Sequence, residues 1–285
     1  MSIERFGKNI SNNKILIITE CFYPEEFKIN DIAFSWQDKG YEVTVLTLFP
    51  TYPIGKVFNG YKNRLFYRET VKGVSVIRLR AITGYKDSFL KKILKYCNFM
   101  ILGSMVSIFI GRKYDFIFGF NMGALTSMVP AVIVRKLFKK PLVFWSQDLW
   151  PDSVYAYGIK KSKTLSYFLD MFVKYIYRSP NFIAITSKGF ESKLSKYISN
   201  KTIIEYMPNW ADDMNMSVEP ITLSSEDLIQ ITFAGNIGKV QNLENIIKAF
   251  CSLPEEMQVR AQFNIIGDGS NLNKLKLLFK KNKNI

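Results

Sequence analysis

The sequence predicts an α/β protein with two domains, each built on a parallel sheet. Three observations support this prediction. Short apolar strands alternate with helical patterns almost from end to end, which is typical of parallel sheets covered by helices. A polar segment without periodicity, 208–227, interrupts the alternation. The pattern then restarts, so we expect a first domain at 1–211, a hinge at 212–227 and part of a second domain at 228–285.

Each element of the first domain follows from its own pattern. The apolar run at 14–20 predicts a buried strand, the periodic apolar residues of 29–40 predict a helix, and 41–49 predicts the strand that completes a βαβ unit. Further strands are expected at 73–80, 114–120, 141–147 and 181–187, with a short one in 203–210. Further helices are expected at 123–140, 163–179 and 188–198. Together these elements predict one complete Rossmann-like domain.

The second domain is expected to begin in the same way. Strands at 228–235 and 259–267 alternate with helices at 243–253 and from 271 onward. Two strands and two helices leave one sheet edge unpaired, which an independent domain rarely tolerates. Either a partner completes this domain or the chain is a shortened form of a longer protein, and we favour the second explanation.

Composition narrows the chemistry. Of 285 residues 48% are hydrophobic, which excludes a disordered polymer. A net charge of +15 favours anionic partners such as nucleotides or phospholipid surfaces, although a proteome rich in Lys, Asn and Ile would raise it equally. The absence of histidine excludes Ser-His and Cys-His nucleophile systems. Three cysteines without metal-ligand spacing suggest reduced structural thiols, and no secretory signal is visible, so we expect a cytoplasmic protein.

Residues 87–113 combine a cationic start with a long apolar run. A spanning helix needs about 20 apolar residues, so this run is short for crossing a bilayer. It suits either a core helix with a solvated basic end or a helix at the inner membrane surface, with its lysines against anionic headgroups. In the second case the residues entering the acyl boundary would be Phe89, Leu90, Ile93 and Leu94.

Four stretches, taken in order and at their spacing, resemble glycosyltransferase family 4, the retaining GT-B enzymes of capsule, O-antigen and colanic-acid-type synthesis. They are 23–61, 147–158, 208–212, and 233–250 with 265–270. The resemblance implies a GT-B-like fold, with the acceptor mostly on the first domain and a UDP- or GDP-sugar donor mostly on the second. It also implies that no tightly bound metal or other cofactor is needed.

The loop GNIGKVQN, 235–242, is the expected site of the donor diphosphate. It lies between a strand and a helix, where backbone N–H groups can neutralise a leaving phosphate. Gly235 and Gly238 let the backbone approach phosphate oxygens, and Lys239 adds a mobile positive charge. The alternative for Lys239 is a surface lysine on a glycine turn.

Three further polar residues complete the expected donor site. Asn236 and Gln241 stand where many family members carry an Arg and a Lys, so their amides are the expected substitutes. By resemblance Asp268 approaches the nucleotide base, although a tight turn placed by Gly267 and Gly269 explains this stretch equally well.

The segment FKIND, 27–31, is the first part of the expected acceptor site. Lys28 could meet an acceptor phosphate, such as the diphosphate of a polyprenyl carrier. Asn30 or Asp31 could orient a sugar hydroxyl. Asp31 could instead be the N-cap of the following helix, which is a common structural use of this residue.

The stretch QDLWPDS, 147–153, supplies the second part. Asp148 is expected at the carboxyl end of a parallel strand, where open α/β sheets place ligands, and a carboxylate there can orient the acceptor nucleophile. Trp150 could stack on a pyranose face. A purely structural role for Asp148 is the alternative. The resemblance implies that the departing phosphate accepts the proton, which argues against a general-base role for Asp148.

Two departures from the family pattern bear on catalysis. Many relatives carry a histidine near the donor sugar, and here Asn121 is the nearest polar substitute. The E-x7-E element that grips the donor in the family is expected beyond Ile285, so this form could be inactive. A non-catalytic acceptor-binding or assembly protein is therefore the alternative function. A nucleic-acid-binding protein has only net charge in its favour, and a nicotinamide enzyme lacks its glycine fingerprint.

Overall fold

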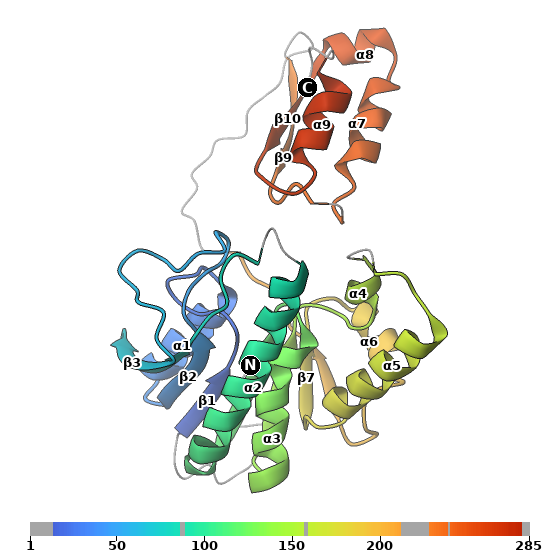
Figure 1. Cartoon of the computed structure of the whole chain (residues 1–285). Coiled ribbons are helices and arrows are strands. Elements are labelled where there is room, and N and C mark those ends of the chain that lie inside the picture. Colours follow the sequence, from blue (N-terminus) through green and yellow to red (C-terminus); the bar gives the residue numbers. More distant parts are fainter. Residues whose placement is uncertain (1–13, 86–88, 157–158, 212–227, 239, 281–285) are drawn as a thin grey trace. The chain divides into compact units, whose positions relative to one another are not determined.

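The computed structural model describes residues 14–85, 89–156, 159–211, 228–238 and 240–280, apart from the side chains of Phe89 and Lys92. The chain divides into two compact units (Figure 1). Unit 1 comprises residues 1–153 and 160–211, and unit 2 comprises residues 154–159 and 212–285. The hinge predicted at 212–227 and the predicted phosphate ligand Lys239 lie outside the described residues.

Unit 1 contains an eight-stranded sheet of order β3-β4-β2-β1-β5-β6-β7-β8. All pairings except β3 with β4 are parallel, so the predicted α/β fold is confirmed. The strands are β1 (Lys14–Ile18), β2 (Glu42–Leu48), β3 (Phe66–Val71), β4 (Val74–Leu79), β5 (Phe116–Asn121), β6 (Leu142–Ser146), β7 (Phe182–Ile185) and β8 (Ile203–Tyr206).

Helices cover both faces of this sheet. Neighbouring residues of the central strands pack into different cores, as the period of two requires: Leu16 lies in one core and Ile17 in the other. The first core is closed by α2, α3, α5 and α6, and the second by α1. The helices are α1 (Lys28–Asp38), α2 (Phe89–Ile110), α3 (Val129–Phe138), α4 (Asp152–Ala156), α5 (Lys163–Tyr177) and α6 (Gly189–Leu194), with 3-10 turns at Gly111–Lys113 and Leu125–Met128.

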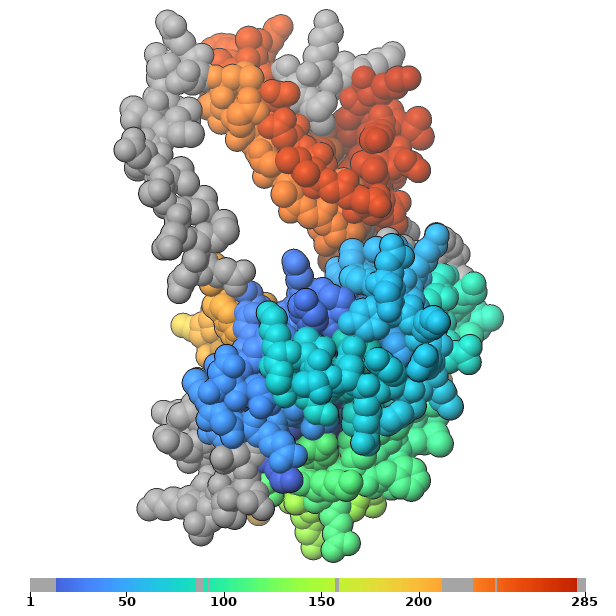
Figure 2. Space-filling view, turned by 90° about the vertical axis from the view of Figure 1, so that its left-hand side faces the viewer, coloured from blue at the N-terminus to red at the C-terminus, as the bar shows by residue number. Residues whose placement is uncertain are grey.

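The edge strand β3 was not predicted from the sequence. It runs antiparallel to β4, and the two form a hairpin whose central residues, Lys72 and Gly73, both have positive φ, 47° and 80°. Two such residues are typical of a two-residue hairpin turn, but the non-glycine position is more often Asn or Asp than Lys. Figure 2 faces this edge of unit 1, where residues of β3 contribute to the surface.

Unit 2 contains a parallel pair, β9 (Ile229–Ala234) and β10 (Ala261–Ile266). Helices α7 (Leu243–Cys251), α8 (Glu255–Val259) and α9 (Leu272–Phe279) accompany them. The predicted strand and helix order is confirmed, except that the short α8 was not predicted. The core of this unit contains Ile237, Ile247 and Phe263.

Candidate functional site

The carboxyl edge of the unit 1 sheet has a switch point between β1 and β5. From β1 the chain passes through α1 to β2 on one side, whereas from β5 it proceeds through β6 and β7 to β8 on the other. Right-handed crossovers then place α1 and the helices after β5 on opposite faces of the sheet. Ligands of open α/β sheets bind at such a point, outside the carboxyl ends of the strands.

Glu25 fixes two loops at this edge. Its carboxylate accepts hydrogen bonds from the backbone N–H groups of Thr51 at 2.8 Å, Tyr52 at 2.6 Å and Phe22 at 3.3 Å. Burial raises the pKa of Glu25, and these backbone donors oppose that shift. The loop after β1 and the loop after β2 are therefore held together by one side chain.

Asn30 is occupied by the same loop. Its Oδ1 accepts from the Tyr23 backbone N–H at 3.1 Å, and its Nδ2 donates to the Glu25 carbonyl at 2.7 Å. Only 7% of the residue is exposed. The Asn30 amide thus shapes the loop after β1, and its contact with a sugar hydroxyl stays a prediction.

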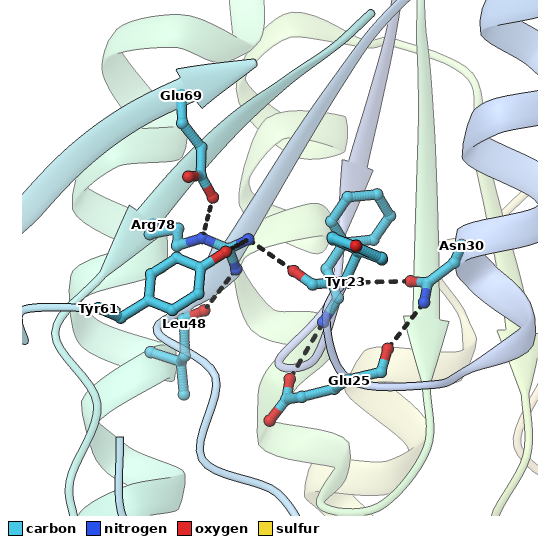
Figure 3. A network of polar contacts seen from close by, with 8 residues as sticks. Tyr23, Glu25, Asn30, Leu48, Tyr61, Glu69 and Arg78 are labelled. Atoms are coloured by element: carbon cyan, nitrogen blue, oxygen red, sulfur yellow. Dashed lines mark hydrogen bonds and ion pairs between the residues drawn. The ribbon is translucent and has the colours of Figure 1, made fainter. Parts of the chain in front are cut away.

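Arg78 on β4 joins this loop to the rest of the edge (Figure 3). The side chain is fully buried and ion-paired with Glu69 of β3. Its guanidinium donates to the carbonyls of Tyr23 at 2.6 Å and Leu48 at 3.5 Å. It also lies 4.9 Å from the ring centroid of Tyr61. The buried guanidinium of Arg78 therefore holds together the loop after β1, the end of β2 and strand β3.

Lys28 and Asp31 lie beside an indole platform. The Trp210 ring stacks on buried Trp145, with centroids 5.6 Å apart and planes 9° apart, and its Nε1 donates to the Asp31 carboxylate at 3.0 Å. The Lys28 ammonium lies 3.4 Å from the same carboxylate and 5.7 Å from the Trp210 centroid. Phe27 occupies the N-cap of α1, so the alternative that Asp31 caps the helix is wrong.

Polar groups without partners gather at the ends of β5 and β6. Asn121 ends β5 and is 1% exposed; its Nδ2 donates to the Ala124 carbonyl at 3.2 Å, but its Oδ1 is buried with no partner among the described residues. The next strand leads into Gln147, whose backbone N–H donates to the Asn121 carbonyl at 2.8 Å. The Gln147 Nε2 is also buried and unpaired within the described ranges. Such groups are costly unless a ligand or water satisfies them.

Asp148 follows directly in the loop after β6. Its backbone carbonyl accepts from the Ser146 hydroxyl at 2.9 Å, which fixes the turn, and burial raises the pKa of its carboxyl. Burial likewise raises the pKa of the neighbouring Tyr177 hydroxyl to about 12. A partly buried carboxylate at a strand end is suited to accept hydrogen bonds from a polyhydroxyl ligand.

Trp150 makes a structural contact in this structure. Its Nε1 donates to the Gly123 carbonyl at 3.0 Å, and its ring meets Phe172 of α5 edge-on at 6.5 Å. One side of the residue borders a pocket of about 270 Å³ with Asp152 and Lys193. The side chain therefore supports the turn after Asn121, and stacking on a sugar stays a prediction.

Glu20 gives this edge a pH dependence. Burial raises its pKa to about 7, nearby Lys95 opposes the shift, and its Oε1 has no partner within the described part of the chain. Because the pKa of Glu20 rises from 4.5 to about 7 on folding, its contribution to stability is fully present below pH 4.5. That contribution is lost as the pH rises through about 7.

In the unaltered protein we therefore expect the free energy of unfolding to fall by up to about 3 kcal/mol between pH 4.5 and about pH 7. In Glu20→Gln this fall should be absent. The measurement is urea unfolding at several pH values, followed by tryptophan fluorescence. Exposed Glu26→Gln is the matched control. An unchanged pH profile in Glu20→Gln would show that this carboxyl is not the titrating group.

In unit 2 two glycine loops interlock. The Gly235 N–H donates to the Ile266 carbonyl at 2.9 Å, and the Ile237 N–H donates to the Asp268 carbonyl at 2.8 Å. A Cβ on Gly267 would lie 1.9 Å from the Gly235 carbonyl oxygen, and one on Gly269 would lie 2.4 Å from the Ile237 oxygen. Gly267 and Gly269 also have φ of 148° and 159°, which other residues rarely adopt. Both the close backbone contact and the dihedral angles therefore require glycine at these positions.

Two predicted donor residues converge in the first loop. A Cβ on Gly238 would lie 2.8 Å from the Gln241 Oε1 and 2.9 Å from the Asn236 Nδ2, so both amides lie over this glycine. The Asp268 carboxylate accepts from the Gly269 N–H at 2.7 Å, which supports the turn explanation for that residue. Its contact with a nucleotide base stays a prediction.

The structure thus groups the predicted residues by unit. Lys28 and Asp31 lie together, and Asn121 ends β5 beside Ser146 of β6, two residues before Asp148. Sequence reasoning missed Glu25 and Arg78, whose bonds join residues 26 and 55 positions apart. It also assigned no role to Trp210, although the PNW stretch that contains it was part of the resemblance.

Comparison with solved structures agrees with this architecture. The galactosyltransferase WaaB, of the lipopolysaccharide outer core, superposes with a TM-score of 0.55 at 14% identity, over 94% of this chain and 64% of WaaB. Anabaena HepE in complex with UDP-glucose gives 0.52 at 13% identity, over 94% and 64%. The chain has the GT-B fold.

Comparison with known sequences shows similarity to glycosyltransferases. Residues 218–284 match the family model described as glycosyl transferases group 1. The probable glycosyltransferase WbjE of Pseudomonas aeruginosa is 24% identical over 168 residues, which are 55% of this chain and 40% of WbjE. The putative colanic acid biosynthesis glycosyl transferase WcaI of Escherichia coli is 24% identical over 252 residues, 81% of this chain and 59% of WcaI. The chain therefore spans less than two thirds of the length of these curated relatives.

Proposed function

We propose that this protein is a retaining glycosyltransferase that moves a hexose-type sugar from a UDP- or GDP-sugar to a polyprenyl-diphosphate-linked glycan in surface polysaccharide synthesis. The observation that carries the proposal is that the glycosyl transferases group 1 match, 218–284, includes the two interlocked glycine loops of unit 2. HepE forms a complex with UDP-glucose, and the name of WcaI refers to colanic acid, which supports the donor class and the polysaccharide role.

Unit 2 supplies the donor side of this proposal. The negative charge of the leaving diphosphate must be stabilised by other groups, because the chain contains no histidine. The Gly235 and Ile237 N–H groups hold the two loops together, so we assign this role to the backbone N–H groups of Asn236 and Gly238 and to the side-chain amides of Asn236 and Gln241 over Gly238. We expect Lys239 to add a positive charge. The departing phosphate oxygen would then accept the proton of the acceptor hydroxyl.

Unit 1 supplies the acceptor side. Lys28 offers a cation for an acceptor phosphate, and the adjacent Trp210 ring, 38% exposed, offers an aromatic face. The unpaired buried atoms of Asn121 and Gln147 and the carboxylate of Asp148 are the groups that sugar hydroxyls would satisfy. Asn121 and Asp148 are therefore the residues that we place next to the reacting hydroxyl.

We expect UDP or GDP to raise the melting temperature of the purified chain, and Asn236→Ala or Gln241→Ala to weaken nucleotide binding about tenfold, because each loses one hydrogen bond to a charged phosphate. Asn264→Ala is the control, since that amide bonds to Gln230 on the sheet. Asp148→Asn should leave nucleotide binding intact and lower sugar transfer. Calorimetry with UDP and GDP, and release of nucleotide from the matching sugar donors, provide the measurements.

The outcomes separate the two candidate functions. Nucleotide binding with transfer or donor hydrolysis supports the enzyme. If neither nucleotide binds but a lipid-linked glycan does, the chain is an acceptor-binding protein. Binding of neither ligand class would overturn both functions.

A further inference from the structure

One outer surface of unit 1 is unusually apolar. Helices α2, α3 and α5 pack on the same core, so their outward sides form one surface (Figure 1). On α2, Met105, Ile108 and Phe109 are 55%, 44% and 79% exposed, and on α5 Phe168 is 59% exposed. By contrast α1, on the opposite face of the sheet and fully described, exposes no large apolar side chain.

Helix α2 is apolar on both of its sides. Phe99 and Ile110 face the core at 0% and 7% exposure, with Val106 packed against it, whereas Ile101, Met105 and their neighbours face outward. Residues 93–113 are, by length and composition alone, long and apolar enough to cross a membrane, so the expectation that this run is too short for a bilayer is wrong. The buried inner side instead favours a helix that lies flat and meets lipid with its outer side only.

Cations surround a groove on the same surface. The groove lies between α3 and α5 and measures about 770 Å³. Its lining includes Arg135, Lys136, Lys139, Lys174 and Arg178 and no acidic residue. The Lys136 ammonium lies 3.6 Å from the centroid of the Tyr175 ring, so an aromatic side chain contributes to the same groove.

The sequence around this surface is strongly biased in charge. Residues 89–140 contain nine Lys and Arg and a single acidic residue, Asp115. A dense array of cations beside exposed apolar helices is complementary to phosphate headgroups above acyl chains. Nucleic acid would match the cations, but it would leave the exposed side chains of α2 in water.

We propose that this α2–α3–α5 surface docks on a membrane rich in acidic phospholipid. Groove cations bind lipid phosphates, while the outward side chains of α2 and Phe168 of α5 enter the interface. The inference goes beyond the proposed function, since it rests on unit 1 alone and holds whether or not the protein transfers sugar.

The charge contribution is tested by vesicle sedimentation of the full chain. Binding is expected to vesicles of phosphatidylcholine mixed with phosphatidylglycerol, and not to phosphatidylcholine alone. Lys136→Glu/Lys174→Glu/Arg178→Glu should bind roughly 100-fold more weakly. The matched control, Lys39→Glu/Lys62→Glu/Lys201→Glu, has the same net charge. Its three lysines are exposed but lie outside the α2–α3–α5 surface, so this variant should bind like the wild type.

The apolar contribution needs its own variant. Phe109→Ser should weaken vesicle binding roughly tenfold, whereas Leu65→Ser, at 64% exposure on the β3 edge, should not. Tryptophan fluorescence melts confirm that each variant is folded. Equal effects of test and control variants would overturn the proposal, as would an absence of binding to the acidic vesicles.

Two further results would also overturn it. Displacement of the protein from vesicles by soluble glycerol phosphate would indicate a site for a small free anion. Groove-dependent binding of a short RNA, without groove-dependent vesicle binding, would indicate a nucleic-acid surface.

Discussion

Replacing Arg78 by methionine is expected to lower the free energy of unfolding of unit 1 by about 3–5 kcal/mol. The change would leave the Glu69 carboxylate without its buried cation and deprive the carbonyls of Tyr23 and Leu48 of a donor. All four tryptophans, Trp36, Trp145, Trp150 and Trp210, lie in unit 1. Urea unfolding followed by tryptophan fluorescence therefore reports on this unit.

Two companion variants sharpen this prediction. Arg80→Met makes the same substitution at an exposed position just after β4 and should change stability little. The double variant Arg78→Met/Glu69→Leu removes both charges and should recover part of the loss, because the unpaired carboxylate is gone. If Arg78→Met alone were as stable as the wild type, the contacts of Arg78 would not contribute to the stability of unit 1.

Gly267→Ala is expected to destabilise unit 2 by about 3–6 kcal/mol, through overpacking and backbone strain together. Its Cβ would lie 1.9 Å from the Gly235 carbonyl oxygen, so the two loops would have to separate. Hydrogen exchange in peptides from 228–280 should rise, while the tryptophan fluorescence melt of unit 1 stays unchanged. The nucleotide-induced rise in melting temperature should also disappear.

Gly123→Ala is the control for this substitution, because a Cβ there meets nothing within 4 Å. It should leave exchange in both units unchanged. Slow exchange in 228–280 of Gly267→Ala would contradict the interlocked loops.

The sequence predicted most of the fold because apolar runs and periodicities are local signals. Strand β1 and helix α5, for example, were recognisable from their own residues. The strand β3 was not, because its residues lie at an edge with little or no burial and its turn uses Lys72. The five-residue α8 is too short to show a helical period.

The candidate site was predicted less completely. Asp148 could be placed after a strand end from topology, whereas Asn121 was proposed through the family resemblance. The function of Glu25 could not, because its partners Thr51 and Tyr52 are backbone groups, which carry no sequence signature. The stacking of Trp210 on Trp145 likewise joins residues that only the folded chain brings together.

The shared carboxylate of Glu25 has a consequence for engineering. A segment 19–27 without the Glu25 carboxylate would leave the Thr51 and Tyr52 N–H groups without this acceptor, and a 49–52 segment of another shape would take two donors away from the Glu25 carboxylate. Chimeras that swap the two segments as a pair should stay folded, whereas single swaps should not. If the proposed function holds, acceptor preference would be changed by replacing the two segments together.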